Sequence, residues 1–589
     1  MSVCLLKTRL AAGSLLIFLL AQTGRAQEPS ASLKQADADY RAGVAALSRN
    51  DLNSALADFE KVVHLEPAAE QGHSALGAVL IRMGRTKEGI RELEKALAMK
   101  PGDGSAQMNL ALAYEQSGEA AKALPLFAKV EVTSKAEKLV LPSAVLASYA
   151  RALAAGKQFP AAVAKMKEAV ASDPRNAELQ DELGSLYAQH QDWANAKQAF
   201  SAALQLNPDF AVAHLHLGIA LQTTQQPGAL DELAKASQLA PQNAVIALQL
   251  GRALAAAGQD EQAIPILQHA LEIDPGLTAA TYQLGLALQR TGSLQDAVPL
   301  LQKAAAAEPK NAEVLTNLGM ALCQAQQAKD AVPILQRAVA LTPENATGHQ
   351  NLAAAYIQLS QFDDAVVQLR AALKLSPNAP QLHYNLGLAF KMQDDAADAI
   401  PELETAEKLD SSAPEAPYVL GVLYMQAGRY DDAARELNAS LKLRPENGDG
   451  WATLGSVDSK LDKLPEAATA LREAIRQLPQ QSDPHLTLAA VLAKQNQPAE
   501  AAAERKQAAE LMRTNMNRQR AEVASNSGNS LLKNGKLDEA IVDFRDAVSY
   551  DPNYVPAHAG LAQALEQQGK TVEAAAERQK AAALEKSSQ

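Results

Sequence analysis

Residues 312–345 read AEVLTNLGMALCQAQQAKDAVPILQRAVALTPEN, and this stretch decides the fold. Its first half carries apolar residues at the i, i+3, i+7 spacing of one helix face, at Leu315, Leu318 and Leu322. After a polar break, the second half repeats a helical spacing at Ala331, Leu335 and Ala338. Pro343 then ends the second helix, because proline cannot continue a helix. The stretch therefore predicts a hairpin of two amphipathic helices.

A single hairpin of this kind would leave its apolar stripe exposed to water. Gly319 and Ala331 carry no bulk where the two helices are expected to cross, so the backbones can approach closely. The next hairpin in a stack would cover the stripe, so the unit has to be repeated.

The repeat is visible along most of the chain as a step of 34 residues. Prolines keep this step with one irregular interval of 33 and a few gaps, at Pro67, Pro101, Pro174, Pro208, Pro241, Pro275, Pro309, Pro343, Pro377, Pro445 and Pro479. A leucine stands nine residues after most of these prolines, often followed by glycine, as at Leu284-Gly285 and Leu386-Gly387. Several registers held in phase predict a solenoid of stacked units.

This pattern resembles the tetratricopeptide repeat (TPR), whose signature includes Leu-Gly in the first helix, small residues at the crossing and a final proline. The resemblance implies an all-α, right-handed superhelical solenoid of about sixteen helix-turn-helix units. Counting back from the prolines places the units in three blocks: units 1–3 in 36–137, units 4–14 in 143–515, and units 15–16 with a tail in 521–589.

Two joints between these blocks are five residues longer than the repeat requires, at 138–142 and 516–520. No proline occurs between Pro498 and Pro552, although the repeat would place one at Arg513. We therefore expect the second helix of unit 14 to continue, even into the first helix of unit 15, and to set the last two units apart.

The first residues have the order of an export signal. Lys7 and Arg9 precede an apolar run over 10–21, and small residues follow at Gly24 and Ala26. The run is too short for a membrane span, which needs about 20 apolar residues. We expect a signal peptide over 1–26, a short leader over 27–35, and no membrane span in the mature protein. The predicted location is periplasmic or secreted, with association with the outer envelope left open.

Composition excludes several classes of protein. The 589 residues are 47% hydrophobic but only 4% aromatic, which favours helices packed through small side chains. The formal net charge of −12 argues against a general nucleic-acid binder, which needs a basic surface. Cys4 and Cys323 are too few for a disulfide framework or a cysteine zinc site.

No motif for catalysis, a cofactor or a metal is present, so we expect a protein that is not an enzyme. Six of the ten histidines share the fourth position of the repeat, where the resemblance implies a bulky packing residue: His73, His214, His349, His383, His485 and His558. Helices pack about 8–10 Å apart, so equivalent histidines of neighbouring units cannot share one metal ion. Acidic pairs such as Asp394-Asp395 recur before the second helix, where carboxylates cap helices.

The sixth position of five consecutive units carries an amide, at Gln249, Gln283, Asn317, Asn351 and Asn385. First helices line the concave groove in the TPR family, and some members resembling the superhelix of O-GlcNAc transferase grip a peptide backbone with asparagines at this position. An amide both donates and accepts, so it can pair with the N–H and C=O groups of an extended peptide. The alternative is that these amides bond within their own stack.

Three tyrosines are expected on the same concave face, as aromatic anchors for a ligand: Tyr282, Tyr384 and Tyr418. The predicted function is a scaffold or adaptor that binds extended peptide segments or partner proteins in this groove. The alternative is an accessory or assembly factor of an envelope polysaccharide-export or secretion complex. The sequence does not name the partner.

Overall fold

The computed structural model describes residues 30–587, which contain 31 helices and no strand. The predicted signal peptide lies outside these residues. The chain divides into two compact units, one ending at Ala307 and the other beginning at Glu308. None of the described helices has both the length and the apolar content needed to cross a membrane.

The first unit is built of helical hairpins, and each odd-numbered helix packs against the even-numbered helix before it. The helices are α2 (Ala31–Ser48), α3 (Leu52–Leu65), α4 (Glu70–Arg82), α5 (Thr86–Met99), α6 (Gly104–Gln116), α7 (Ala120–Ala136), α8 (Ser143–Ala155), α9 (Phe159–Ser172), α10 (Ala177–Gln189), α11 (Trp193–Leu206), α12 (Ala211–Thr223), α13 (Ala229–Leu239), α14 (Ala244–Ala256), α15 (Asp260–Ile273), α16 (Thr278–Arg290) and α17 (Leu294–Ala307).

The second unit continues the same architecture. Its helices are α18 (Ala312–Gln324), α19 (Ala328–Leu341), α20 (Ala346–Gln358), α21 (Phe362–Leu375), α22 (Pro380–Met392), α23 (Ala396–Leu409), α24 (Glu415–Gln426), α25 (Tyr430–Leu443), α26 (Gly448–Lys460), α27 (Leu464–Gln477), α28 (Asp483–Lys494), α29 (Pro498–Lys533), α30 (Leu537–Tyr550), α31 (Val555–Gln567) and α32 (Thr571–Ser587). The expected all-α solenoid of stacked hairpins is confirmed.

The hairpin quoted first forms as its sequence predicts. Residues 312–324 make α18 and residues 328–341 make α19. Leu315, Leu318 and Leu335 are buried, and a side chain at Gly319 would collide with Leu335. Glycine is therefore needed here for the close approach of the two helices.

Within each unit, the first helices of neighbouring hairpins lie closer together than the second helices do. Direct packing links α4 with α6 and α12 with α14 in the first unit, and α18 with α20 and α24 with α26 in the second. Among the described helices, no neighbouring pair of second helices packs to a similar extent. The first helices therefore form the inner face of each stack.

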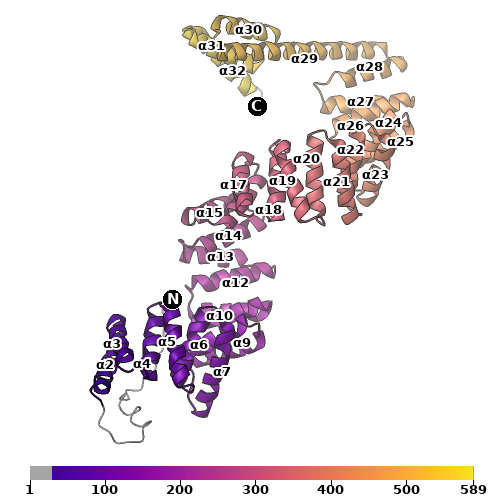
Figure 1. Cartoon of the computed structure of the whole chain (residues 1–589). Helices are drawn as coiled ribbons and strands as arrows, with labels where there is room; N and C mark the ends of the chain where they lie inside the picture. Colours follow the sequence, from indigo (N-terminus) through magenta and orange to yellow (C-terminus); the bar gives the residue numbers. More distant parts are fainter. Residues whose placement is uncertain (1–29, 588–589) are drawn as a thin grey trace. The chain divides into compact units, whose positions relative to one another are not determined.

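One helix departs from the hairpin pattern. α29 runs for 36 residues from Pro498 to Lys533, so the five added residues 516–520 lie inside it. Its first part packs against α28, and the helix also packs against α30 and α31 (Figure 1). The structure thus contains the continuous helix that the missing proline led us to expect.

A buried carboxylate marks a weak point in α26. Asp458 is only 6% exposed, and the equivalent residues of neighbouring hairpins are buried and apolar or aromatic: Leu322, Tyr356, Phe390, Tyr424 and Leu492. Burial raises the pKa of Asp458, because water no longer solvates the charged form.

Asp458→Leu should therefore raise the free energy of unfolding at neutral pH, by about 1–3 kcal/mol. A raised pKa in the folded state costs stability as the pH rises above the ordinary carboxyl range of about 4, so the gain should shrink in acid. Thermal unfolding followed by circular dichroism at neutral pH and at acidic pH measures this effect. Asp546→Leu, at an exposed position of α30, is the control. A lower melting temperature for Asp458→Leu would contradict the explanation.

Candidate functional site

The five predicted amides lie on first helices, and each directly precedes the buried leucine of its helix. Gln249 and Gln283 lie on α14 and α16 of the first unit, whereas Asn317, Asn351 and Asn385 lie on α18, α20 and α22 of the second. All five side chains are half-buried. The second unit thus holds three asparagines at one position of three consecutive inner helices.

The amides differ in what they bind within the chain. Asn385 accepts a hydrogen bond from Gln381 Nε2 at 3.0 Å, so part of its bonding capacity is used on its own helix. Within residues 30–587, the side chains of Gln249, Gln283 and Asn351 make no hydrogen bond to another protein group. Asn351 therefore has both its donor and its acceptor available, which a backbone-binding amide requires.

The predicted tyrosines are half-buried on inner helices. Tyr282 lies on α16 in the first unit, and Tyr384 and Tyr418 lie on α22 and α24 in the second. Burial is the main cause that raises the pKa of Tyr384 and Tyr418, with nearby Glu415 and Asp449 acting in the same direction. Both hydroxyls therefore stay protonated at neutral pH and can donate a hydrogen bond.

The inner face of the first unit carries a charge network that the sequence analysis missed. Arg151 on α8 pairs with Glu115 on α6 and with Glu182 on α10, each at 2.9 Å, and also donates to Ser148. His216 on α12 contacts Asp181 on α10 at 2.9 Å. Charges on these helices are thus already satisfied by one another, which distinguishes this region from the amide row of the second unit.

The repeated histidines form a hydrogen-bonded clamp rather than a packing contact alone. In the first unit, His73 Nε2 donates to the Pro67 carbonyl at 3.1 Å, and Nδ1 lies 2.5 Å from Glu92 Oε2. The same two-sided arrangement, with Glu or Gln as the second partner, recurs at His214, His349, His383 and His558, and His485 keeps the carboxylate partner. All of these histidines except His485 thus tie the proline that ends one repeat to the second helix of the next.

Two other residues at this repeat position make the same contact with the preceding proline. Trp451 Nε1 donates to the Pro445 carbonyl at 2.8 Å, and Gln107 Nε2 donates to the Pro101 carbonyl at 2.6 Å. The expectation of a bulky packing residue is thus incomplete, because most of these histidines, Trp451 and Gln107 aim an N–H donor at the preceding proline. Ala247, Thr281 and Leu315 occupy the same position without such a donor. The sequence signal was the spacing of six residues between proline and donor. His214 and His216, two residues apart, have different partners.

Two further features bear on chemistry. Cys323 is buried, and burial raises the pKa of its thiol, so the reactive thiolate is disfavoured. Within the described part of the chain, no group of three or more His, Cys, Asp or Glu side chains is arranged to hold a metal ion.

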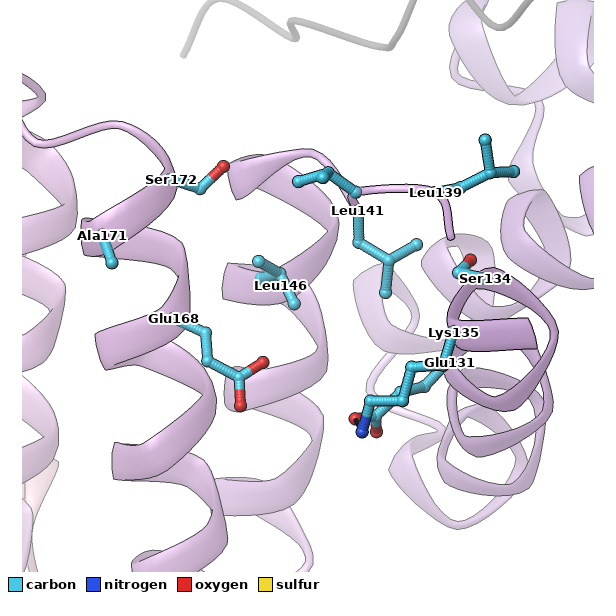
Figure 2. Close-up of a pocket in the computed structure, with 10 residues that line it drawn as sticks. Glu131, Ser134, Lys135, Leu139, Leu141, Leu146, Glu168, Ala171 and Ser172 are labelled. Carbon is cyan, nitrogen blue, oxygen red and sulfur yellow. Dashed lines mark hydrogen bonds and ion pairs between the residues drawn. The ribbon is translucent and has the colours of Figure 1, made fainter. Parts of the chain in front are cut away.

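The lengthened joint at 138–142 opens a pocket in the first unit. Its volume is about 380 Å³, and Figure 2 shows Leu141 pointing into it from above while Leu139 points away. Glu131 and Lys135 on α7 and Glu168 on α9 form its polar sides. Leu139 and Val140 are 60% and 84% exposed, so the joint presents apolar side chains to solvent. The sequence located the insertion but gave no sign of the pocket.

Comparison with known families agrees with this geometry. One model described as tetratricopeptide repeat matches residues 74–138, 148–211 and 282–346, and a second such model matches 227–288 and 391–456. A model described as TPR repeat matches 354–394 and 528–569. Together these matches cover more than half of the chain. The chain belongs to the tetratricopeptide repeat family.

Several solved structures are similar to parts of the chain. The Cut9-Hcn1 hetero-tetramer of the APC/C matches at 16% identity, covering 84% of this chain and 96% of that chain, with a TM-score of 0.33. MamA from Desulfovibrio magneticus RS-1 matches at 25% identity, covering 29% and 96%, with a TM-score of 0.28. YrrB, described as a TPR protein with an unusual peptide-binding site, matches at 22% identity, covering 33% and 97%, with a TM-score of 0.29. No curated protein matches the sequence.

Proposed function

We propose that this protein is a non-catalytic scaffold that binds extended peptide segments of partner proteins along the inner face of its second unit. The observation that carries the proposal is the row of half-buried asparagines on three consecutive inner helices, α18, α20 and α22. A TPR stack is built from short units that expose a long surface, and such surfaces serve protein binding. The two tyrosines on α22 and α24 would supply anchors beside the amides.

The free energies of binding show what the asparagines and the tyrosines would each have to contribute. Three net hydrogen bonds at about 1 kcal/mol each would give about 3 kcal/mol. Association costs about 4–15 kcal/mol in lost freedom, so the amides would align a peptide but could not hold it alone. Tyr384 and Tyr418 would therefore have to bury apolar surface of the ligand, and truncating them should weaken binding of every sequence.

Replacing Asn317, Asn351 and Asn385 together by alanine should weaken peptide binding about 100-fold, because about 3 kcal/mol is lost. The probes are peptides selected on the purified full chain from a random peptide library, with affinities measured by fluorescence polarisation. The control replaces three exposed lysines on second helices of the same hairpins, Lys329, Lys374 and Lys408, and should leave binding unchanged. Unchanged binding by the asparagine variant would remove the amides from the site.

We also propose that the protein is exported, on the basis of the basic, apolar and small-residue order of residues 1–26. Cleavage after Ala26 would leave Gln27 as the new N-terminus. Mass spectrometry of the protein from its native envelope or medium should find this end. An intact N-terminus at Met1 would contradict export by this route.

A further inference from the structure

The long helix α29 separates its charges onto two sides. With about 100° of rotation per residue, its exposed basic and apolar residues fall within an arc of about 120°: Arg505, Lys506, Met512, Arg513, Met516 and Arg520. We call this set the basic face of α29. The acidic residues of the helix, Glu500, Glu504, Glu510 and Glu522, lie outside that arc.

The acidic side is partly used within the chain, whereas the basic face makes no ion pair. Glu504 contacts His485 Nδ1 at 2.5 Å, and Glu500 contacts Arg472 at 3.4 Å. Among the described residues, the four cations of the basic face have no carboxylate partner, and Arg520 only lies over the ring of Tyr550 at 6.0 Å. A cationic face is thus left in a chain whose net charge is −12.

Apolar side chains accompany these cations. Met512 and Met516 are 45% and 47% exposed, and Val523 on the same side is 71% exposed. Methionine is flexible and polarizable, so it adapts to the surface of a partner. The basic face therefore combines positive charge with exposed apolar side chains. Contact with water alone does not require such apolar side chains.

The sequence of α29 departs from that of the preceding second helices. Arg505 stands where the preceding hairpins bury a large apolar side chain, such as Leu437 and Leu471. The last hairpin of the chain has the same substitution, Arg578, and shares the segment EAAAER at 500–505 and 573–578. Terminal repeats of solenoids carry polar outer faces. The hairpin of α28 and α29 therefore has the polar outer face of a terminal repeat, although two hairpins follow it.

Elsewhere in the second unit, the next first helix covers each second helix, as α26 covers α25 and α28 covers α27. On α29 the chain instead continues straight, so the basic face is left without that covering helix. The occupant that fits such a face is a helix, because helices pack at about 8–10 Å through ridges and grooves.

We propose that the basic face of α29 docks an acidic amphipathic helix of a partner protein. Carboxylates of that helix would pair with Arg505, Arg513 and Arg520, and its apolar residues would cover Met512 and Met516. The stretch from 505 to 523 extends about 27 Å at about 1.5 Å per residue, so a partner helix of about five turns would span it. This surface is separate from the asparagine row on α18, α20 and α22, and its test does not depend on that site.

The probe is a fluorescent synthetic helix of about 18 residues with leucine at i, i+3, i+4 and i+7 and glutamate at the other positions. A second probe replaces every glutamate by lysine. The purified full chain should bind the glutamate helix at least tenfold more tightly than the lysine helix in fluorescence polarisation. R513E/R520E should weaken binding of the glutamate helix at least tenfold, and rising salt should weaken binding to the unchanged chain.

R518E is the matched control, because Arg518 lies on the same helix but outside the arc of the basic face. It should leave binding unchanged, and circular dichroism should show that all variants keep their helix content. The milder R513Q/R520Q variant repeats the test if charge reversal disturbs folding. Equal binding of the two probes, or an equal loss with R518E, would overturn the proposal. A dimer in sedimentation that R513E/R520E dissolves would also overturn it, since a second copy would then cover the face.

Discussion

Replacing Gly387 by valine is expected to destabilise the hairpin of α22 and α23 by about 3 kcal/mol, through overpacking of a helix crossing. A Cβ atom at Gly387 would lie 2.6 Å from Leu403 Cγ and 3.2 Å from the Ala399 carbonyl oxygen. The first neighbour is a fully buried core side chain and the second is backbone, so neither can move away cheaply. The two helices would have to separate, and the apolar stripe between them would open.

The control is Gly102→Ala, since no atom lies within 4 Å of the side chain that would be added there. Urea unfolding followed by circular dichroism should show an early phase in Gly387→Val that neither the control nor the unchanged protein shows. Repeat arrays lose cooperativity when one unit is weakened, so the early phase should be partial. An unfolding curve that coincides with that of the unchanged protein would show that the crossing can relax.

Residues at these crossings explain why so much of the fold could be predicted. The periodic Leu, Gly, Ala and Pro residues of 312–345 encode the apolar helix face, the close approach of the two helices and the helix end within one hairpin. Each of these is a local property. The missing proline near Arg513 is also local, and it predicted the continuity of α29. Repetition then extends one correct assignment along the chain.

The site could be predicted only in part, because its features join separate repeats. The position of Asn351 on an inner helix followed from the repeat register. The pairing of Arg151 with Glu115 and Glu182 did not, since it spans three hairpins and depends on side-chain reach. The same limit explains why the histidines were assigned to packing although all of them except His485 are hydrogen-bonded to the end of the preceding repeat.

The second large effect is expected at one of these histidines. His73→Phe keeps a flat ring of similar size but removes both hydrogen bonds of the clamp. His73 is 4% exposed, so the Pro67 carbonyl and the Glu92 carboxylate would lose a partner in a poorly hydrated place. A buried polar group left without its partner costs about 1–3 kcal/mol. Thermal unfolding at neutral pH should therefore show a lower melting temperature, whereas His64→Phe on α3, which interrupts no clamp, should show little change.

The clamp should also make the free energy of unfolding depend on pH, with a loss of stability as the pH falls. Burial acts to raise the pKa of Glu92, but hydrogen bonds from Lys95 and His73 outweigh it, so the pKa lies below its usual value. A carboxyl group with a lowered pKa in the folded state stabilises the protein above its unfolded pKa of about 4.3, and this contribution is lost as the pH falls through the folded value. His73→Phe removes one of the two hydrogen bonds that lower this pKa. The loss of stability between about pH 5 and pH 3 should therefore be smaller in the variant than in the unchanged protein. Parallel curves for the two proteins over this range would show that the histidine does not act through Glu92.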